Sequence, residues 1–228
     1  MQLENITTTR RDDEKRRYDD ACAAAHGMDL IGERWSMPLI RELLLGPRRF
    51  SDLKTSLNGI SANVLTQRLE GLEAAGVLFR RKLPPPASVQ VYELTPWGYE
   101  SAPIFQALGR WAVRSPRHDA TRPFSPVSLM LSLRTMMSPA AAGDLEARIQ
   151  LDMGGEHFFW IRQDGEVKIG RGAIEQPNLV LRGTPSAIAG YVYAGAPLSS
   201  IDIEGDTKLA TRLPSLFPFP EKARLTAA

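Results

Sequence analysis

Apolar residues recur at helical spacing through the first sixty positions of the chain. The predicted elements are helices over residues 19–32, 36–46 and 51–59. Asp19 or Asp20 is the expected N-cap of the first helix and Ser51 that of the third, while Gly46-Pro47 ends the second. The pattern therefore predicts three short amphipathic helices that share one core.

A fourth helix has an unusual polar face. Ser61 is its expected N-cap and Gly76 its terminating residue. The buried stripe is predicted to comprise Ile60, Val64, Leu65, Leu69 and Leu72. The opposite face carries Ala62, Asn63, Thr66, Gln67 and Glu70, with Arg68 at its flank. An ordinary amphipathic helix more often carries Glu and Lys on its exposed face, whereas Asn, Gln and Thr can contact base edges.

Two strands follow this helix. Residues 77–82 and 89–94 alternate as strands do, and the proline-rich segment 83–88 forms a stiff tip between them. A further helix is expected over residues 97–113. Three helices, a fourth with a polar face and a basic two-stranded loop occur in the order of a winged helix-turn-helix.

The pattern changes after a Pro- and Arg-rich linker at residues 115–123. Helices are expected over 125–136, 184–195 and 206–216, and strands over 147–151, 157–162, 166–169, 178–182 and 201–204. Asp164-Gly165 is a strong hairpin signal. We expect an α+β domain in which helices cover one face of an antiparallel sheet. The predicted organisation is a flexible arm over 1–18, a DNA-binding domain over 19–116 and the α+β domain over 117–228.

Composition fits a folded, non-membrane protein. The 228 residues are 43% hydrophobic and 24% charged, enough for two domains. We expect no membrane span and no secretory signal, because no apolar run approaches the required length. With Cys22 as the single cysteine, no intrachain disulfide can form, which favours the cytoplasm. The chain has no phosphate-binding glycine loop or nucleophile motif, so we expect neither an enzyme nor a cofactor.

Charge is distributed unevenly although the net charge is only +2. Between Arg34 and Lys82 nine basic and four acidic side chains leave a local excess of five. Such a basic surface suits phosphate contact, although charged residues also serve simply to solvate helices.

Residues 21–113 closely resemble the HxlR-type branch of winged-helix regulators. The resemblance rests on Cys22 ten residues before Gly32 and on the segments LIGERW, LLLGPRRFSDL, GISANVLTQRLEGLEAAG and VYELTPWG. It implies a homodimeric transcriptional repressor or activator that binds a two-fold DNA operator; we expect a repressor here.

The DNA-binding candidates divide into three groups. Asn63, Thr66 and Gln67 are expected to contact bases. Ser61 at the helix start and Arg68 at its flank are expected to contact phosphates, as are Arg48 and Arg49 ahead of the third helix. On the wing, Arg80, Arg81 and Lys82 alternate in direction, so at most two face DNA; Arg80 and Lys82 are the candidates.

The C-terminal half resembles a sterol-carrier-protein-type domain. The resemblance rests on FFWIRQDGEVKIGRG, PNLVLRGTPSAIAGYVYAGAP and IDIEGDTKLATRLPSLF. It implies a layer of helices on a curved sheet and a hydrophobic small-molecule effector between them. The candidate ligand contacts are Phe158, Trp160, Ile188, Tyr191 and Val192. These residues could equally fill a core. An alternative function for the whole protein is that of a lipid carrier, whose N-terminal domain serves assembly.

Cys22 has two interpretations. It is a structural helix residue or, as in some relatives of the resembled family, a redox sensor. Cys22 and His26 have the i,i+4 spacing of metal ligands, but only His118 and His157 remain to complete a site, each isolated in sequence. We therefore expect no metal.

Overall fold

The computed structural model describes residues 18–224 and shows two compact units. The first unit combines the described residues up to Leu43 with Pro47–Gly98, and the second combines Leu44–Gly46 with the chain from Tyr99 onward. Nearly all of the predicted arm over 1–18 lies outside the described residues. The compact units separate at Gly98. The domain boundary expected at residue 116 remains a prediction.

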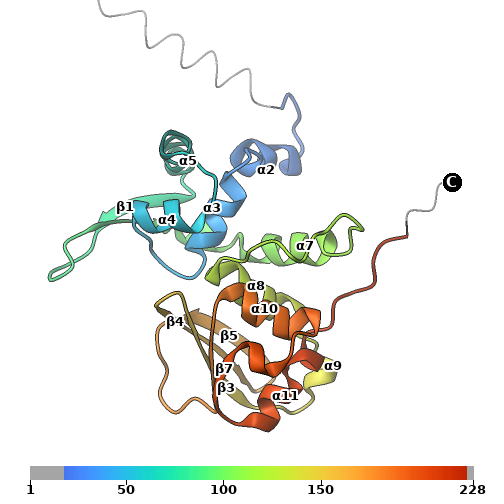
Figure 1. The fold of residues 1–228 in the computed structure, drawn as a ribbon. Coiled ribbons are helices and arrows are strands. Elements are labelled where there is room, and N and C mark those ends of the chain that lie inside the picture. Colours follow the sequence, from blue (N-terminus) through green and yellow to red (C-terminus); the bar gives the residue numbers. More distant parts are fainter. Residues whose placement is uncertain (1–17, 225–228) are drawn as a thin grey trace, which may run out of the picture. The chain divides into compact units, whose positions relative to one another are not determined.

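The first unit is a helical bundle with a two-stranded wing (Figure 1). Its elements are α2 (Ala23–Ile31), α3 (Ser36–Leu43), α4 (Phe50–Ser56), α5 (Ala62–Ala74), β1 (Leu78–Lys82) and β2 (Gln90–Leu94). Leu39, Ile40, Leu53 and Leu65 have no exposed surface. The core therefore forms where the apolar stripes of α3, α4 and α5 meet, as their spacing predicts.

Two predicted caps were wrong. Helix α2 starts after Cys22, because the carboxylate of Asp20 accepts the Cys22 N–H at 2.9 Å and so acts before the helix begins. Helix α4 starts at Phe50, one residue before Ser51. The Asp52 carboxylate accepts the Arg49 N–H at 3.3 Å, so this side chain satisfies the helix start in place of the Ser51 hydroxyl.

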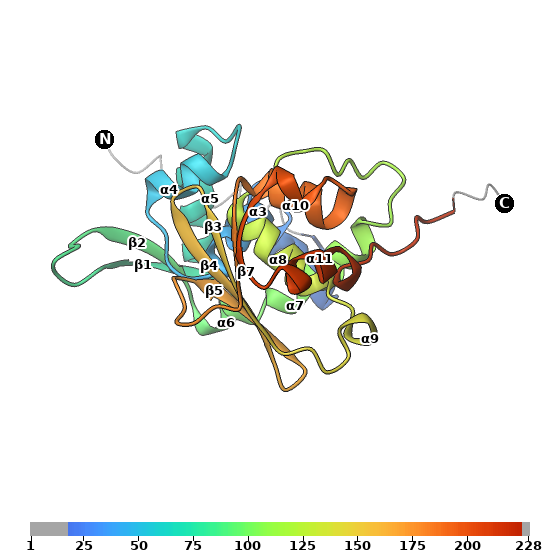
Figure 2. The same cartoon turned by 60° about the horizontal axis from the view of Figure 1, so that its bottom comes forward.

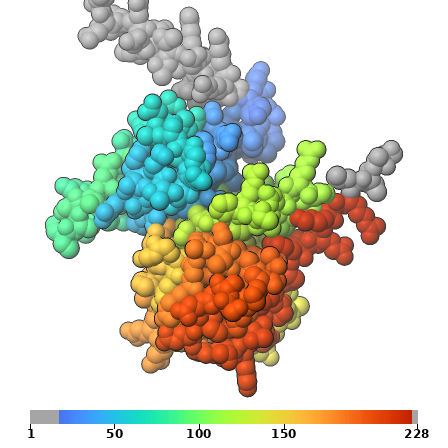
Figure 3. Space-filling view, viewed as in Figure 1, coloured from blue at the N-terminus to red at the C-terminus, as the bar shows by residue number. Residues whose placement is uncertain are grey.

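The wing is an antiparallel pair running from Leu78 opposite Leu94 to Lys82 opposite Gln90. Arg48 adds a backbone bridge to Tyr92, with N···O distances of 2.9 and 2.8 Å. Figure 3 shows the wing extending from the surface of the first unit. Together with the helices, it makes this unit a winged helix-turn-helix.

The single helix expected over 97–113 is broken into α6 (Pro96–Tyr99) and α7 (Ala102–Ala112). Pro103 explains the break, because a proline within a continuous helix would clash with the carbonyl four residues earlier. In the structure it occupies the first turn of α7, where no backbone N–H is needed.

The second unit also contains a five-stranded sheet and several helices (Figure 2). The helical elements are α8 (Pro126–Met136), α9 (Pro139–Ala142), α10 (Pro185–Ala194), a 3-10 turn (Leu198–Ser200) and α11 (Thr207–Leu216). The strands are β3 (Ala147–Met153), β4 (Glu156–Gln163), β5 (Glu166–Arg171), β6 (Leu179–Arg182) and β7 (Asp202–Gly205).

The sheet is mixed, so the expectation of an antiparallel sheet was wrong for one strand pair. The strand order is β5-β4-β3-β6-β7, and β6 runs parallel to β3. The reason is the connection after β5, which returns the chain to the far side of β3 in the same direction as β3. All other neighbouring pairs are antiparallel.

One face of this sheet is the core of the second unit. Buried and half-buried residues alternate strictly along β3, which places Ile149 and Leu151 on the inner face. Residues from α8, α10 and α11 join the same apolar cluster, so these helices cover that face. The β4-β5 hairpin turns at Asp164 and Gly165, whose φ values of 52° and 79° suit the tight turn that this dipeptide predicts.

Candidate nucleic-acid interface

The polar face of α5 lies on the surface of the first unit. The Ser61 hydroxyl accepts the Val64 N–H at 3.2 Å, which fixes the start of the helix. Asn63, Thr66 and Gln67 are exposed, whereas the predicted apolar stripe faces inward with Leu65 fully buried. Three side chains able to contact base edges therefore share one exposed stretch of a capped helix.

Arg68 differs from the other candidates on α5 because it already has a partner. Its guanidinium lies 3.4 Å from the Glu33 carboxylate, in the turn between α2 and α3. The Arg68 side chain is 22% exposed and that of Glu33 46%. This ion pair ties α5 to the preceding helices, so a phosphate would have to compete with Glu33 for Arg68.

The wing cations are also partly engaged. Arg80 and Lys82 lie on the same face of β1, as the alternation predicts, and both are exposed. Arg80 pairs with Glu73 of α5 at 2.7 Å, and this carboxylate raises the pKa of Arg80. Arg81 pairs with Glu93 on the neighbouring strand. Lys82 stands nearest the tip of the wing.

Arg48 and Arg49 precede α4 but have different environments. The Arg48 backbone forms the bridge to Tyr92, and its guanidinium lies within hydrogen-bond distance of Ser56, at 3.5 Å. Arg49 is exposed. Arg48 is therefore bound to the wing strand β2 through its backbone, whereas Arg49 lies at the surface beside the start of α4.

Cys22 is exposed and lies at the N-cap of α2. The nearby backbone N–H groups of Ala25 and Ala24 lower the pKa of its thiol, which favours the reactive thiolate. The ring of His26 faces Asp29, with Nδ1 4.0 Å from the carboxylate. Over residues 18–224 the structure shows no group of three or more potential metal-ligating His, Cys, Asp or Glu side chains.

The five candidate ligand contacts of the C-terminal half come together in the core of the second unit. Phe158 and Ile188 have no exposed surface, and Trp160 is 1% exposed. Tyr191 and Val192 are also buried, and the Tyr191 hydroxyl donates to the Ala210 carbonyl at 2.6 Å. The indole N–H of Trp160 is buried and has no hydrogen-bond partner among the described residues.

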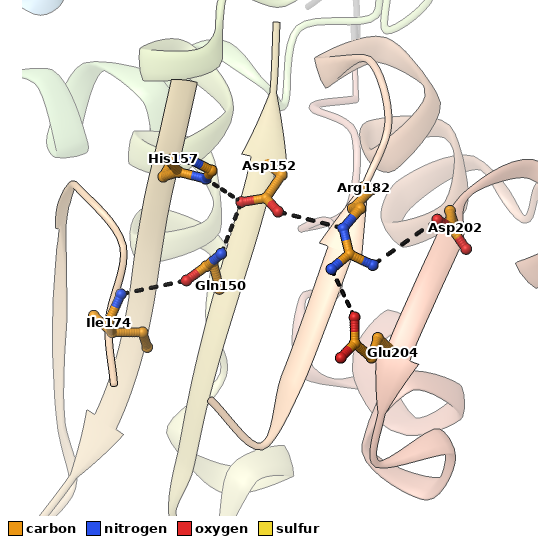
Figure 4. Close-up of polar contacts among 7 residues, drawn as sticks. All are labelled: Gln150, Asp152, His157, Ile174, Arg182, Asp202 and Glu204. Atoms are coloured by element: carbon orange, nitrogen blue, oxygen red, sulfur yellow. Dashed lines mark hydrogen bonds and ion pairs between the residues drawn. The ribbon is translucent and has the colours of Figure 1, made fainter. Parts of the chain in front are cut away.

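The outer face of the sheet carries a polar cluster that sequence reasoning missed (Figure 4). Asp152 on β3 accepts a hydrogen bond from Gln150 at 2.9 Å and lies 2.7 Å from His157 of β4. Its other oxygen lies 3.4 Å from Arg182 of β6, which also pairs with Glu204 of β7 at 2.6 Å. The cluster therefore links four adjacent strands. Its members alternate with core residues in sequence, but only the strand register shows that they meet.

The fold and the exposed face of α5 define a winged helix-turn-helix protein of the DNA-binding class. Residues 30–119 match the family of HxlR-like helix-turn-helix proteins. The chain belongs to this family of DNA-binding transcriptional regulators. The sheet and helices α8, α10 and α11 lie beyond the matched residues.

Relatives and solved structures cover the same region. The HTH-type transcriptional regulator YvaP of Bacillus subtilis is 35% identical over 85 residues, which are 37% of this chain and 79% of YvaP. YodB of the same organism is 34% identical over 83 residues, 36% of this chain and 74% of YodB. The reduced form of YodB aligns over 44% of this chain and all of its own, with 29% identity and a TM-score of 0.39.

No helix within residues 18–224 has the length and apolar character needed to span a bilayer.

Proposed function

We propose that this protein is a homodimeric repressor that binds a two-fold duplex operator, with α5 in the major groove. The observation that supports this most directly is the exposed trio Asn63, Thr66 and Gln67 on a capped helix within a winged unit. These side chains contact base edges and select the sequence. Ser61, Arg49, Arg80 and Lys82 contact phosphates, which supply affinity that falls with salt.

Helix α7 supplies the dimer contact in this proposal. Ile104, Leu108 and Trp111 lie at i, i+4 and i+7 on one face and are 51%, 44% and 74% exposed. The helix also packs beside α8, where Arg110 donates to the Thr135 carbonyl at 3.0 Å. Large apolar side chains gathered on an exposed face are typical of a protein interface. A dimer joined there carries two α5 helices, as a two-fold operator requires.

The direct test is duplex binding at several salt concentrations, with DNA fragments taken from a genome-wide map of bound sites in the source cell. A repressor in the cytoplasm should prefer its mapped sites over scrambled duplexes by orders of magnitude, and its affinity should fall steeply with salt. A lipid carrier with an assembly domain should show no such preference. Equal binding to mapped and scrambled duplexes would therefore contradict the proposed function.

The second unit binds an apolar effector in this proposal, in keeping with its resemblance to sterol-carrier-type domains. The unpaired indole N–H of Trp160 lies in the same apolar cluster as Phe158, and the Trp160 ring contacts that of Phe217. It supports a ligand that offers a hydrogen-bond acceptor within an apolar body. Native mass spectrometry of the purified protein should detect such a ligand, and Trp160→Phe should release it. If native mass spectrometry detects no bound ligand, the second unit has a structural role instead.

A redox switch at Cys22 is the second candidate function. It is supported by the exposure of the thiol and by its position at the start of α2, where two backbone N–H groups lower its pKa. With no second cysteine in the chain, oxidation would yield an intersubunit bond or a small-thiol adduct. Cys22→Ser should then bind DNA but lose its response to diamide. A serine variant that keeps the response excludes the thiol switch.

A further inference from the structure

A cleft of about 700 Å³ opens in the first unit between α2 and the second half of α5. The two helices appear in blue and teal in Figure 1. Gly71 and Ala74 of α5 and the C-cap Ala75 line one side, and Met28 and Leu30 of α2 line the other. The base-contact candidates Asn63, Thr66 and Gln67 are not among the lining residues, whereas the phosphate-contact candidate Arg68 is.

Gly71 is unusual among these residues. It lies inside α5, where glycine costs helix stability relative to alanine. Its φ is not in the left-handed region, and a Cβ added there would meet no atom within 4 Å. Neither backbone conformation nor packing within the protein therefore requires glycine at this position. Because Gly71 has no side chain, the α5 backbone is exposed to the cleft at this position.

The cleft is lined by two carboxylates, those of Asp29 and Glu33, and by two guanidinium groups, those of Arg34 and Arg68. Asp29 already accepts the Tyr18 N–H at 3.0 Å, and Glu33 pairs with Arg68 at 3.4 Å. Arg34, by contrast, forms no ion pair with any residue in the described range; its guanidinium lies 5.7 Å from the centroid of the Trp35 ring. One side of the cleft, which we call its floor, is therefore formed by the small apolar residues Gly71, Ala74 and Ala75. The guanidinium of Arg34 has no carboxylate partner among the described residues.

We propose that this cleft binds a small aromatic carboxylate. The flat ring lies over Gly71 and Ala74, and the carboxylate contacts Arg34 and competes with Glu33 for Arg68. Because the Arg68–Glu33 pair ties α5 to the turn after α2, the ligand loosens this tie when it binds. The regulatory consequence, a change in operator affinity, rests on the proposed DNA-binding function of α5.

Calorimetry on the full-length protein without DNA tests the site. The probe is 2-naphthoate, compared with 2-naphthamide, which has the same ring system and no charge. We expect the acid to bind about tenfold more tightly, because a hydrogen bond to a charged group is worth more than one to a neutral group. Glu33→Gln removes the competing carboxylate and should strengthen naphthoate binding several-fold.

Gly71→Leu fills the floor and should weaken naphthoate binding by about tenfold or more. Gly71→Ala should weaken it less while raising helix stability. Gly27→Ala is the matched control, because Gly27 is a helical glycine of α2 that lies outside the lining and also has open space around it. It should gain stability and keep the wild-type affinity.

Several results would overturn the site: no naphthoate binding, equal binding of acid and amide, or unchanged binding to Gly71→Leu. Sedimentation of Gly71→Leu is the further check, since dissociation of subunits without loss of naphthoate binding would assign the cleft to a subunit contact. A protein that binds operator DNA but not naphthoate overturns the site alone. One that binds naphthoate but no duplex retains the site and overturns the DNA-binding function.

Discussion

Arg80 of the wing and Glu73 of α5 form an ion pair with a nitrogen-to-oxygen distance of 2.7 Å. The Arg80 side chain is 47% exposed and that of Glu73 28%. The pair joins the strand that follows α5 to the helix itself, so the two elements proposed to contact DNA are held together. It also occupies a cation that DNA phosphates would otherwise attract.

Glu73→Gln should therefore strengthen duplex binding. Loss of this exposed pair should leave the free energy of unfolding nearly unchanged, because water screens it. Arg80, once released, can contact a phosphate, and the slope of log affinity against log salt should steepen by up to about 1. Glu204→Gln is the matched control, because it breaks the exposed Arg182–Glu204 pair in the second unit. An unchanged slope in Glu73→Gln would mean that the pair with Glu73 does not keep Arg80 from a phosphate.

Gln67→Ala should relax sequence discrimination. If Gln67 contacts a base with both amide atoms, its removal costs about 1–3 kcal/mol at the operator and little on unrelated duplexes. Folding should be unaffected because Gln67 is exposed. Fluorescence anisotropy on operator and scrambled duplexes measures the difference, and Gln163→Ala at the end of β4 is the control. Equal losses on both duplexes would mean that Gln67 does not contact a base.

Substitutions at Ser61 separate helix capping from phosphate contact. Ser61→Ala removes the acceptor for the Val64 N–H and should lower the free energy of unfolding by about 1 kcal/mol. Ser61→Asp keeps an acceptor there and should retain stability, but its charge should repel the phosphate and weaken DNA binding. Urea unfolding and duplex titration of both variants check this. Wild-type DNA affinity in Ser61→Asp would remove Ser61 from the interface.

Much of the first unit follows from its sequence. Ser61 and the stripe ending at Leu72 predict α5 almost to the residue, because a hydroxyl cap and helical apolar spacing both act locally. The predicted wing strands also match β1 and β2 closely. The helix starts near Asp20 and Ser51 were misplaced, because Asp20 bonds the Cys22 N–H ahead of α2 and the neighbouring Asp52 bonds the Arg49 N–H at the start of α4.

Contacts between distant positions were not predictable in the same way. The pairing of Arg68 with Glu33 and of Arg80 with Glu73 depends on tertiary geometry, so the local excess of basic residues overstated the cations free to bind DNA. The parallel alignment of β6 with β3 likewise depends on where the chain returns after β5. A strand's residue pattern does not encode the direction of its neighbour.

The stability of the second unit should depend on pH through Tyr193. Its hydroxyl lies 2.9 Å from that of Ser132, and its ring stacks on Phe219 with centroids 4.6 Å apart. Burial raises the pKa of Tyr193 far above that of an exposed tyrosine, and burial also raises the pKa of Tyr191. The folded state therefore keeps the phenol protonated at pH values where the unfolded chain loses the proton.

The sign follows from this difference: the stabilising effect is complete below a pH of about 10 and is lost as the pH rises further, because the unfolded state then binds fewer protons. Tyr193 should lower the free energy of unfolding by roughly 1.4 kcal/mol per pH unit above that value. Tyr193→Phe should reduce the slope measured by urea unfolding between about pH 9 and 11. If Tyr193→Phe retains the wild-type slope, the Tyr193 phenol is not the group that couples folding to alkaline pH.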